Sequence, residues 1–508
     1  MSAHEALEAL REHLRTVQDL DAAAAVLDWD QATYMPPGGA AARARQMATL
    51  GRLAHEMRVS TRAGERIDAA ARAVESLPED HPDRALVRLA RREYERARRV
   101  PSDLVAEIRR HTAASYVAWT EARPRGDFAA VRPYLERTLE LSLRYADCFP
   151  DRSHPADPAI DENDPGYDVA SLRGLFAALR ERLVPIVATL ARRPPPDDGF
   201  LRRFYPRAAQ LDLARHVVGA LGYDWNRGRC DLTHHPFMTR FSVGDVRITT
   251  RVDENDLRSC FFACVHECGH ALYEQGIAPD YDGLPLGLGV SAGVHESQSR
   301  FWENQIARDE AFWRWCLPLA RDAFPAQLSD VSLEALVRAV NRVEPGLIRV
   351  QADEVTYNLH VLIRFDLECA MLEGRLRVAD LPDAWDERYE RDLGIRPPGP
   401  RDGVMQDVHW YGGLIGGYFQ GYTLGNLLAA QLREALEREQ PGWREAVGAG
   451  SFGGLLGWLR ERVHVHGSRY EPAELVVRAT GAPLSVEPFV RYLERKYGSL
   501  YGVALGSA

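Results

Sequence analysis

The feature that most constrains this chain is an H-E-x-x-H motif at residues 266–270, inside an apolar stretch that the sequence predicts to be a helix over residues 259–273. Helical residues four positions apart project on the same side, so His266 and His270 can bind one metal ion. Glu267, one step round the helix, can reach a water molecule on that metal and act as a general base. The alternative interpretation is a hydrogen-bonded pair of core histidines.

Two histidines supply only half of a tetrahedral metal site. A catalytic zinc site needs a third protein ligand and an open position for water. Glu296 is the best candidate, 26 positions after His270, beyond a connection rich in Gly and Pro. We expect a helix, a loop and a second helix that returns this carboxylate to the first. The extended pattern H-E-x-x-H-x-x-G-x-x-H is not met, because Tyr273 and Gly276 stand where it requires Gly and His. The third ligand is therefore predicted to be Glu rather than His.

Three cysteines, Cys260, Cys264 and Cys268, repeat every four residues on the same helix. Cys264 and Cys268 each lie two residues from a histidine, a rotation of about 200°. They therefore face away from the metal, and we expect them to pack in the core. The chain has seven cysteines, an odd number spread over 508 residues, which is not the pattern of a disulfide framework.

Charge and hydropathy exclude several classes of partner. The net charge of −10 argues against nucleic acid as the main partner. No stretch of about eighteen uninterrupted apolar residues is present, so no membrane partner is expected. Residues 1–17 form a charged amphipathic segment without the apolar core of a secretory signal. We expect a cytoplasmic protein.

Helical periodicity dominates the rest of the chain, and the predicted fold class is mainly α. Breaker clusters and apolar spacing predict helices over residues 7–29, 40–77, 83–99, 103–122 with Ser102 as cap, 128–148, 169–193, 208–221, 333–343, 349–374, 382–393, 408–437, 455–462, 472–480 and 488–497. Residues 150–166, rich in Asp and Pro, are predicted to be a loop. Alternating β-branched residues predict one small sheet over residues 231–251, with a turn at 242–245. One large helical domain over residues 1–508 is expected, with the helices of residues 1–125 as a lid.

One helix, over residues 83–99, is crowded with seven arginines. Such a run is typical of a solvated face. A lid that steers substrate is the alternative interpretation.

Several polar residues downstream can carry chemistry. Arg349 can bind a carboxylate with its planar fork, or lie on the surface. His409 can donate to an oxyanion, or simply begin a helix. Tyr418 and Tyr422 are four apart and are expected to share a helical face, where either phenol can stabilise a tetrahedral intermediate or serve only for packing.

Six short blocks occur in order along the chain: residues 235–237 (HPF), 245–249 (DVRIT), 266–270 (HECGH), 295–298 (HESQ), 348–353 (IRVQAD) and 403–410 (GVMQDVHW). With these blocks the whole chain resembles the M32 metallocarboxypeptidases. The N-terminal segment Trp29-Asp30-Gln31 with residues 35–39 is similar to the family as well.

This resemblance implies a mostly helical fold with a deep central groove, a small sheet beside the metal helix, and a homodimer. It implies Zn²⁺, or Co²⁺ in some members, held by His266, His270 and Glu296, with Glu267 as the catalytic base. It also implies removal of single residues from peptides with a free C-terminus, with broad specificity.

The substrate side of the site follows from the same blocks. An exopeptidase must recognise the C-terminal carboxylate, and we expect Arg349 to bind it, with Arg247 as the competitor. We also expect His235, Asp353 and Gln406 to contribute to substrate binding, and His409, Tyr418 or Tyr422 to stabilise the oxyanion.

Two other functions are compatible with the motif. The first is an endopeptidase or a dipeptidyl-releasing enzyme on a similar scaffold; an aminopeptidase is disfavoured because no G-x-M-E-N-type block is present. The second is a peptide-binding protein without catalysis, against which the intact His266, Glu267, His270 and Glu296 argue.

Overall fold

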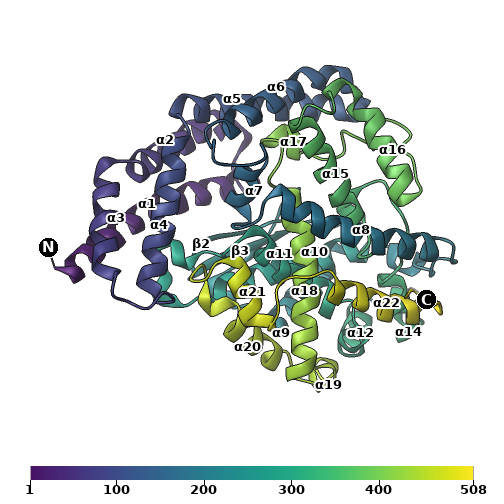
Figure 1. Cartoon of the computed structure of the whole chain (residues 1–508). Coiled ribbons are helices and arrows are strands. Elements are labelled where there is room, and N and C mark those ends of the chain that lie inside the picture. Colours follow the sequence, from purple (N-terminus) through teal and green to yellow (C-terminus); the bar gives the residue numbers. More distant parts are fainter. Residues whose placement is uncertain (1, 507–508) are drawn as a thin grey trace.

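Helices account for most of the described chain, residues 2–506 of this computed structural model, and the sheet found among these residues has three short strands (Figure 1). The mainly α prediction is confirmed. Of the predicted N-terminal segment, Met1 lies outside the described residues. None of the described helices combines the length and the apolar character that a membrane crossing requires.

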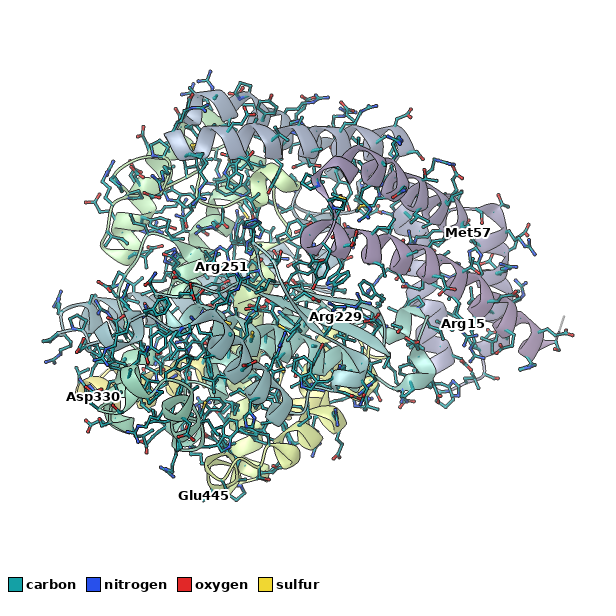
Figure 2. The ribbon with its side chains drawn as sticks, turned by 180° about the vertical axis from the view of Figure 1, so that it is seen from behind. Arg15, Met57, Arg229, Arg251, Asp330 and Glu445 are labelled. Carbon is teal, nitrogen blue, oxygen red and sulfur yellow. The ribbon has the colours of Figure 1, made fainter. Side chains whose placement is uncertain are left out.

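The N-terminal helices form one end of the molecule and its upper edge in Figure 1. They are α1 (Ala3–Thr33), α2 (Ala40–Arg58), α3 (Thr61–Val74), α4 (Pro82–Arg99), α5 (Ser102–Ala122) and α6 (Phe128–Ala146). The view from behind places Arg15 of α1 and Met57 of α2 together at this end, far from Asp330 (Figure 2). The prediction of one helix over residues 40–77 is wrong, because the Ser60 side chain accepts a hydrogen bond from the amide of Ala63 and starts a new helix.

The cap predicted for α5 is also wrong. Pro101 occupies the N-cap position, and Ser102 is the first helical residue. The helix therefore starts one residue earlier than expected, without a side-chain cap.

The arginines of α4 make ion pairs with other segments. Arg88 and Arg92 pair with Glu471 near the other end of the chain, at 2.9 and 3.2 Å, and Arg96 pairs with Glu162 at 2.9 Å. These contacts join α4 to segments that are distant in the sequence. The run is therefore an interface between elements more than a solvated face.

A short helix interrupts the segment predicted as a loop. Residues 150–166 contain α7 (Asp157–Asn163). The buried Asp157 carboxylate accepts hydrogen bonds from the amides of His154 and Val169, both at 2.9 Å. These long-range contacts, which are not visible in the local composition, order the segment. Helices α8 (Val169–Ala191) and α9 (Arg207–Leu221) follow as expected.

The sheet has the strand order β1-β3-β2. Its strands are β1 (Cys230–Leu232), β2 (Met238–Ser242) and β3 (Asp245–Thr250). Strands β2 and β3 pair antiparallel across the predicted turn, whereas β1 pairs parallel to β3. Strand β3 leads directly into α10 (Leu257–Gly276), which carries the H-E-x-x-H motif.

The C-terminal half is again helical. It contains α11 (Ala292–Arg300), α12 (Glu310–Ala323), α13 (Pro325–Leu328), α14 (Leu333–Val340), α15 (Tyr357–Leu372), α16 (Leu381–Leu393), α17 (His409–Gly412), α18 (Phe419–Glu439), α19 (Trp443–Gly448), α20 (Gly453–Arg462), α21 (Pro472–Thr480) and α22 (Glu487–Tyr501). Two predicted helices are shorter than expected. Arg349 lies in a separate 3₁₀ turn before α15, and glycines 416 and 417, both with positive φ, separate α17 from α18.

Helix α18 lies between the two largest hydrophobic clusters. Leu428 packs with the side chains of α10, α12 and α20, whereas Leu427 packs with those of α8, α15 and α22. A smaller cluster joins α1, α3 and α4 to Leu284 and Leu286, in the connection between α10 and α11. The N-terminal helices therefore have their own core and rest on the loop that precedes α11.

Candidate metal centre

Three predicted ligands meet where α10 and α11 cross. Donor atoms of His266, His270 and Glu296 all lie within 4.8 Å of one another. The Glu296 Oε2 atom is 3.4 Å from His270 Nε2 and 3.7 Å from His266 Nε2. The single turn of α10 between the histidines and the return of α11 therefore place two nitrogens and one oxygen around a common point.

The other ring nitrogen of each histidine is already engaged. His266 Nδ1 lies 2.9 Å from Glu303 Oε2. His270 Nδ1 lies 2.6 Å from His295 Nδ1 and 3.1 Å from the His295 carbonyl, and His295 Nε2 lies 2.9 Å from Glu274 Oε1. Partners of this kind orient a metal-binding imidazole and increase its basicity. Both Nε2 atoms are left to face Glu296.

The two oxygens of the Glu296 carboxylate have different partners. Its Oε1 accepts a hydrogen bond from Arg300 Nε at 2.7 Å, while its Oε2 faces the imidazoles and accepts from Ser299 Oγ at 3.1 Å. Burial opposes ionisation, yet Arg300 and then the two imidazoles hold the pKa of Glu296 well below its usual range. The carboxylate is therefore charged and presents one oxygen to a metal.

Two glycines let the helices approach Glu296 at backbone contact. A Cβ added at Gly269 of α10 would lie 2.6 Å from the Gln298 carbonyl oxygen and from the Ser299 Cα of α11. A Cβ added at Gly425 of α18 would lie 2.6 Å from both the Cβ and the Cγ of Glu296. Only glycine allows such a close approach. Helix α11 is held between α10 and α18 by these contacts.

A π-helical turn, η7 (Phe301–Ile306), continues α11 and positions Glu303. Such turns are frequent at functional sites. The second oxygen of Glu303 accepts from Arg308 Nη2 at 3.2 Å, and Arg300 also reaches this carboxylate. Burial opposes the charge, but Arg300 and His266 lower the pKa of Glu303 to about 2. An ionised carboxylate therefore contacts His266 Nδ1, the ring nitrogen that does not face Glu296.

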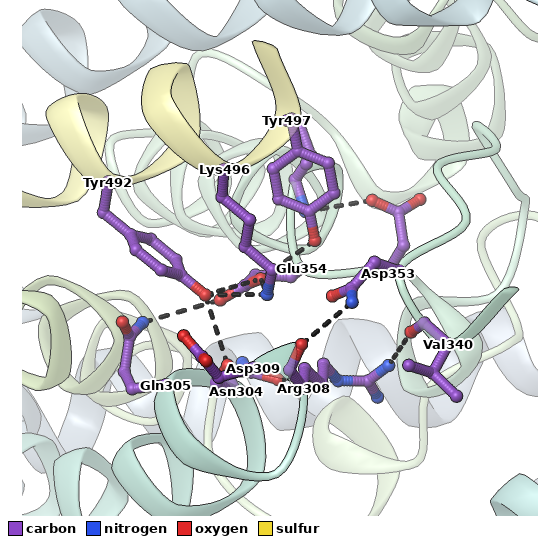
Figure 3. A network of polar contacts seen from close by, with 12 residues as sticks. Asn304, Gln305, Arg308, Asp309, Val340, Asp353, Glu354, Tyr492, Lys496 and Tyr497 are labelled. Atoms are coloured by element: carbon purple, nitrogen blue, oxygen red, sulfur yellow. Dashed lines mark hydrogen bonds and ion pairs between the residues drawn. The ribbon is translucent and has the colours of Figure 1, made fainter. Parts of the chain in front are cut away.

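The same turn is held on its far side by the C-terminal helix (Figure 3). Glu354 Oε2 accepts from Lys496 Nζ at 2.8 Å, Tyr497 at 2.9 Å and Tyr492 at 3.1 Å. The Tyr492 hydroxyl also lies 3.2 Å from the Asn304 carbonyl oxygen. A buried polar cluster on α22 thus contacts the π turn that carries Glu303.

Glu267 has the properties expected of a general base. Its carboxylate makes no hydrogen bond or ion pair within residues 2–506, and its side chain is 7% exposed. Burial raises its pKa to about 7, with a further contribution from Glu296 and Glu303 against the opposing effect of His266. A carboxyl with a pKa near neutrality can both accept and return a proton.

His409 and Tyr422 meet beside the ligands. His409 Nε2 lies 3.1 Å from the Tyr422 hydroxyl, and His409 Nδ1 lies 3.2 Å from Asp407 Oδ1. Burial lowers the pKa of His409, although Asp407 opposes this, so its ring is neutral near pH 7. Tyr418 is different: it is 50% exposed and precedes α18. Tyr418 is the N-cap of α18 and not part of the helix, yet the rings of Tyr418 and Tyr422 both lie against His409, with centroids 6.1 and 6.0 Å from its ring.

The guanidinium of Arg349 is already occupied. It is buried, and its Nε and Nη2 bind the two oxygens of Asp407 at 2.9 and 2.7 Å, while Nη1 donates to Tyr357 at 3.0 Å. Arg364 Nε donates to the same Asp407 at 2.6 Å. The fork that a substrate carboxylate would need therefore holds a carboxylate of the protein.

Arg247 is paired in the same way, with Asp245 at 2.8 and 2.7 Å, and its guanidinium stacks on Trp29. Gln406 accepts from the Arg349 amide at 2.9 Å and donates to the Leu347 carbonyl at 2.8 Å. These side chains hold neighbouring segments together and leave no free fork for a ligand.

Asp353 likewise accepts from the amides of Val355, Thr356 and Glu344 at 2.9–3.1 Å. His235 is the exception among the predicted substrate-binding residues. It is exposed, and its side chain makes no hydrogen bond within residues 2–506.

Comparison with known proteins decides the family. The profile described as Carboxypeptidase Taq (M32) metallopeptidase matches residues 9–497. The chain belongs to the M32 family. It is a metallocarboxypeptidase, a hydrolase of peptide bonds.

Its relatives cover the whole chain. It is 44% identical over 516 residues to Thermostable carboxypeptidase 1 of Thermus thermophilus, covering 99% of this chain and 100% of that one. It is 38% identical to Carboxypeptidase 1 of Bacillus subtilis, covering 96% and 97%. The crystal structure of M32 carboxypeptidase from Deinococcus radiodurans R1 superposes with a TM-score of 0.95 at 48% identity, covering 98% of this chain and 100% of that one.

Membership of a metallopeptidase family implies a divalent metal, and the donors present fit one. Two imidazole nitrogens and one carboxylate oxygen are the ligand set of many catalytic zinc sites. Asp407, which organises Arg349, Arg364 and His409, lay within a recognised block but had no signal of its own.

Proposed function

We propose that this metallocarboxypeptidase releases single residues from the free C-terminus of peptides, with broad specificity, using a divalent metal held by His266, His270 and Glu296. The observation that carries the proposal is the convergence of these three donors beside an unpaired Glu267 carboxylate. Zn²⁺ suits the donors best, and Co²⁺ is the alternative.

When bound, the metal supplies Lewis acidity, which polarises the scissile carbonyl and makes a water molecule easier to deprotonate. Glu267 takes the proton from the attacking water at a carboxylate oxygen. It then returns that proton to the nitrogen of the leaving amino acid. Burial raises the pKa of Glu267 and so makes its carboxylate a stronger base than an exposed glutamate, which suits proton transfer.

His409 and Tyr422 are the candidates for stabilising the oxyanion. In the structure the neutral His409 ring and the Tyr422 hydroxyl hold each other at 3.1 Å. Arrival of a carbonyl oxygen would let the Tyr422 hydroxyl turn from His409 towards it. Arg349 acts through Asp407, which orients His409, and the half-exposed Tyr418 ring lies against His409.

The remaining expectations concern assembly. We propose one functional unit over residues 1–508 in a cytoplasmic homodimer, with the helices of residues 1–125 as a lid over a central groove. The small core of α1, α3 and α4 supports the lid, because these helices pack mainly on one another and meet the rest of the protein at the connection between α10 and α11.

A time course by mass spectrometry on an unblocked peptide tests the reaction. With Zn²⁺ or Co²⁺ added, the expected product is a ladder that loses one C-terminal residue per step. Glu267→Gln should bind the metal equally well and lose turnover by at least about 10²-fold. Internal cuts, or steps of two residues, would contradict the exopeptidase assignment, and an active Glu267→Gln would contradict the role of the base.

A further inference from the structure

A carboxypeptidase needs a cation for the C-terminal carboxylate of its substrate, and the arginines closest to the metal ligands are already paired. Each is held by one or more carboxylates of the protein: Arg300 by Glu296 and Glu303, Arg349 and Arg364 by Asp407, Arg308 by Glu303, and Arg247 by Asp245. Breaking such a pair for a substrate would leave a protein carboxylate without its partner, at a cost in free energy.

Arg251 is the arginine beside the site that lacks such a pair. It is exposed and directly follows β3, and its guanidinium makes no hydrogen bond or ion pair with any residue between 2 and 506. Figure 2 shows Arg251 near the middle of the molecule, below the helices of the upper edge. An unpaired guanidinium loses little when it binds a carboxylate, and its fork favours the bidentate form.

Backbone pairing places His235 next to Arg251. The amide of Thr233 donates to the Thr250 carbonyl, and the amide of Thr249 donates to the Phe237 carbonyl, both at 2.9 Å. The segment between residues 233 and 237 therefore wraps around the end of β3. The His235 ring lies at the apex of this segment, beside the residue that follows Thr250.

Charged groups of the site also act on the His235 ring. Partial desolvation and then the positive charges of Arg251, His409 and Arg349 keep the pKa of His235 below its usual range, with Asp407 opposing. His235 therefore lies within electrostatic reach of both Arg251 and the pair formed by Asp407 and His409.

The chain also links this corner directly to the metal ligands. Residues 251–256 join β3 to α10, whose third and fourth turns carry the histidines. A carboxylate bound here and a peptide bond at the metal would therefore be held by consecutive segments of the chain.

We propose that Arg251, assisted by His235, binds the C-terminal carboxylate of the substrate, in place of Arg349 or Arg247. The inference rests on the proposed release of C-terminal residues and names the subsite that such a reaction requires.

The test compares Arg251→Ala and Arg251→Lys with the wild-type enzyme, loaded with Zn²⁺, on one peptide made with a free C-terminal carboxylate and with a C-terminal carboxamide. Arg193→Ala is the matched control, because Arg193 is also exposed and its side chain makes no hydrogen bond or ion pair within residues 2–506, but it lies just beyond the end of α8. Arg251→Ala should lower kcat/KM on the free acid by about 10- to 100-fold and leave the carboxamide rate unchanged. Arg251→Lys should recover part of the loss, and Arg193→Ala should show none.

Two further readouts separate a binding role from a structural one. Because the Arg251 guanidinium makes no hydrogen bond or ion pair within residues 2–506, the Tm and the Zn²⁺ affinity of Arg251→Ala should match the wild type. If Arg251→Ala cleaves the free acid as fast as wild type, or slows both substrates equally, the inference is overturned. If the wild-type enzyme itself releases no single C-terminal residue, the proposed function fails, and that outcome is distinct from a failure of the Arg251 assignment.

Discussion

The contact between Gly425 and Glu296 makes a quantitative prediction. In Gly425→Ala the new Cβ would lie 2.6 Å from the Cβ and Cγ of the glutamate. Carbon atoms in ordinary contact are about 3.5–4.0 Å apart. Either α18 or the Glu296 side chain must therefore move by about 1 Å. Metal–ligand distances tolerate only about 0.2 Å, so the movement should be felt at the metal.

Two free-energy terms oppose each other in this substitution. Overpacking a dense core costs about 1–3 kcal/mol, and replacing Gly by Ala inside a helix recovers up to about 1 kcal/mol. The net loss of folding stability should be about 1–2 kcal/mol. The Zn²⁺ affinity should fall by at least about tenfold, because a displaced ligand cannot reach its former position.

Gly457→Ala is the matched control. Gly457 is an exposed glycine in α20 and has no atom within 4 Å of an added Cβ. This variant should be unchanged in metal affinity and slightly more stable than wild type, by up to about 1 kcal/mol. Thermal unfolding of the metal-free proteins measures stability, and competition with a chelator measures Zn²⁺ affinity.

The outcome that would refute the reasoning is specific. If Gly425→Ala binds Zn²⁺ as tightly as wild type, the approach of α18 does not position Glu296. If both glycine variants lose metal affinity equally, the effect belongs to helix stability in general.

Three other substitutions test the surroundings of the site. Glu303→Gln should weaken Zn²⁺ binding by about 10- to 100-fold in chelator competition, because His266 loses its ionised partner; unchanged affinity would contradict this. Arg349→Ala should lower stability by about 3–5 kcal/mol in thermal unfolding, because Asp407 is left with Arg364 alone; a variant that only raises KM would instead support a direct substrate contact. Burial raises the pKa of Glu368 to about 7, so the folded protein binds more protons than the unfolded chain between about pH 4.5 and 7, and stability falls as pH rises through this window. Glu368→Gln should remove that loss of stability, which is worth about 3 kcal/mol. The Tm of this variant relative to the Tm of the wild type should therefore rise between pH 4.5 and 8. A Tm difference that stays constant over this range would show that Glu368 titrates normally.

The sequence alone predicted the elements whose causes are local. The spacing of His266 and His270 follows from the helical repeat, and the small sheet follows from alternation and a turn within a short segment. Glu296 could be named because it lies in the helix predicted after the Gly- and Pro-rich connection, where a carboxylate can return to the first helix. Helices α8 and α9, whose ends were predicted to within two residues, have clear breakers at their borders.

Only the tertiary structure decided which polar groups are free. Arg349 and Asp407 are 58 positions apart, and no local pattern announces that they form a buried pair. Asp157 orders a segment that composition assigned to a loop. Arg251 could be selected as a carboxylate-binding residue only because the structure shows that the neighbouring arginines are paired. Local spacing is determined by backbone geometry, which every short segment carries in itself. The partner of a charged group is selected by burial and by segments that meet only in the folded chain.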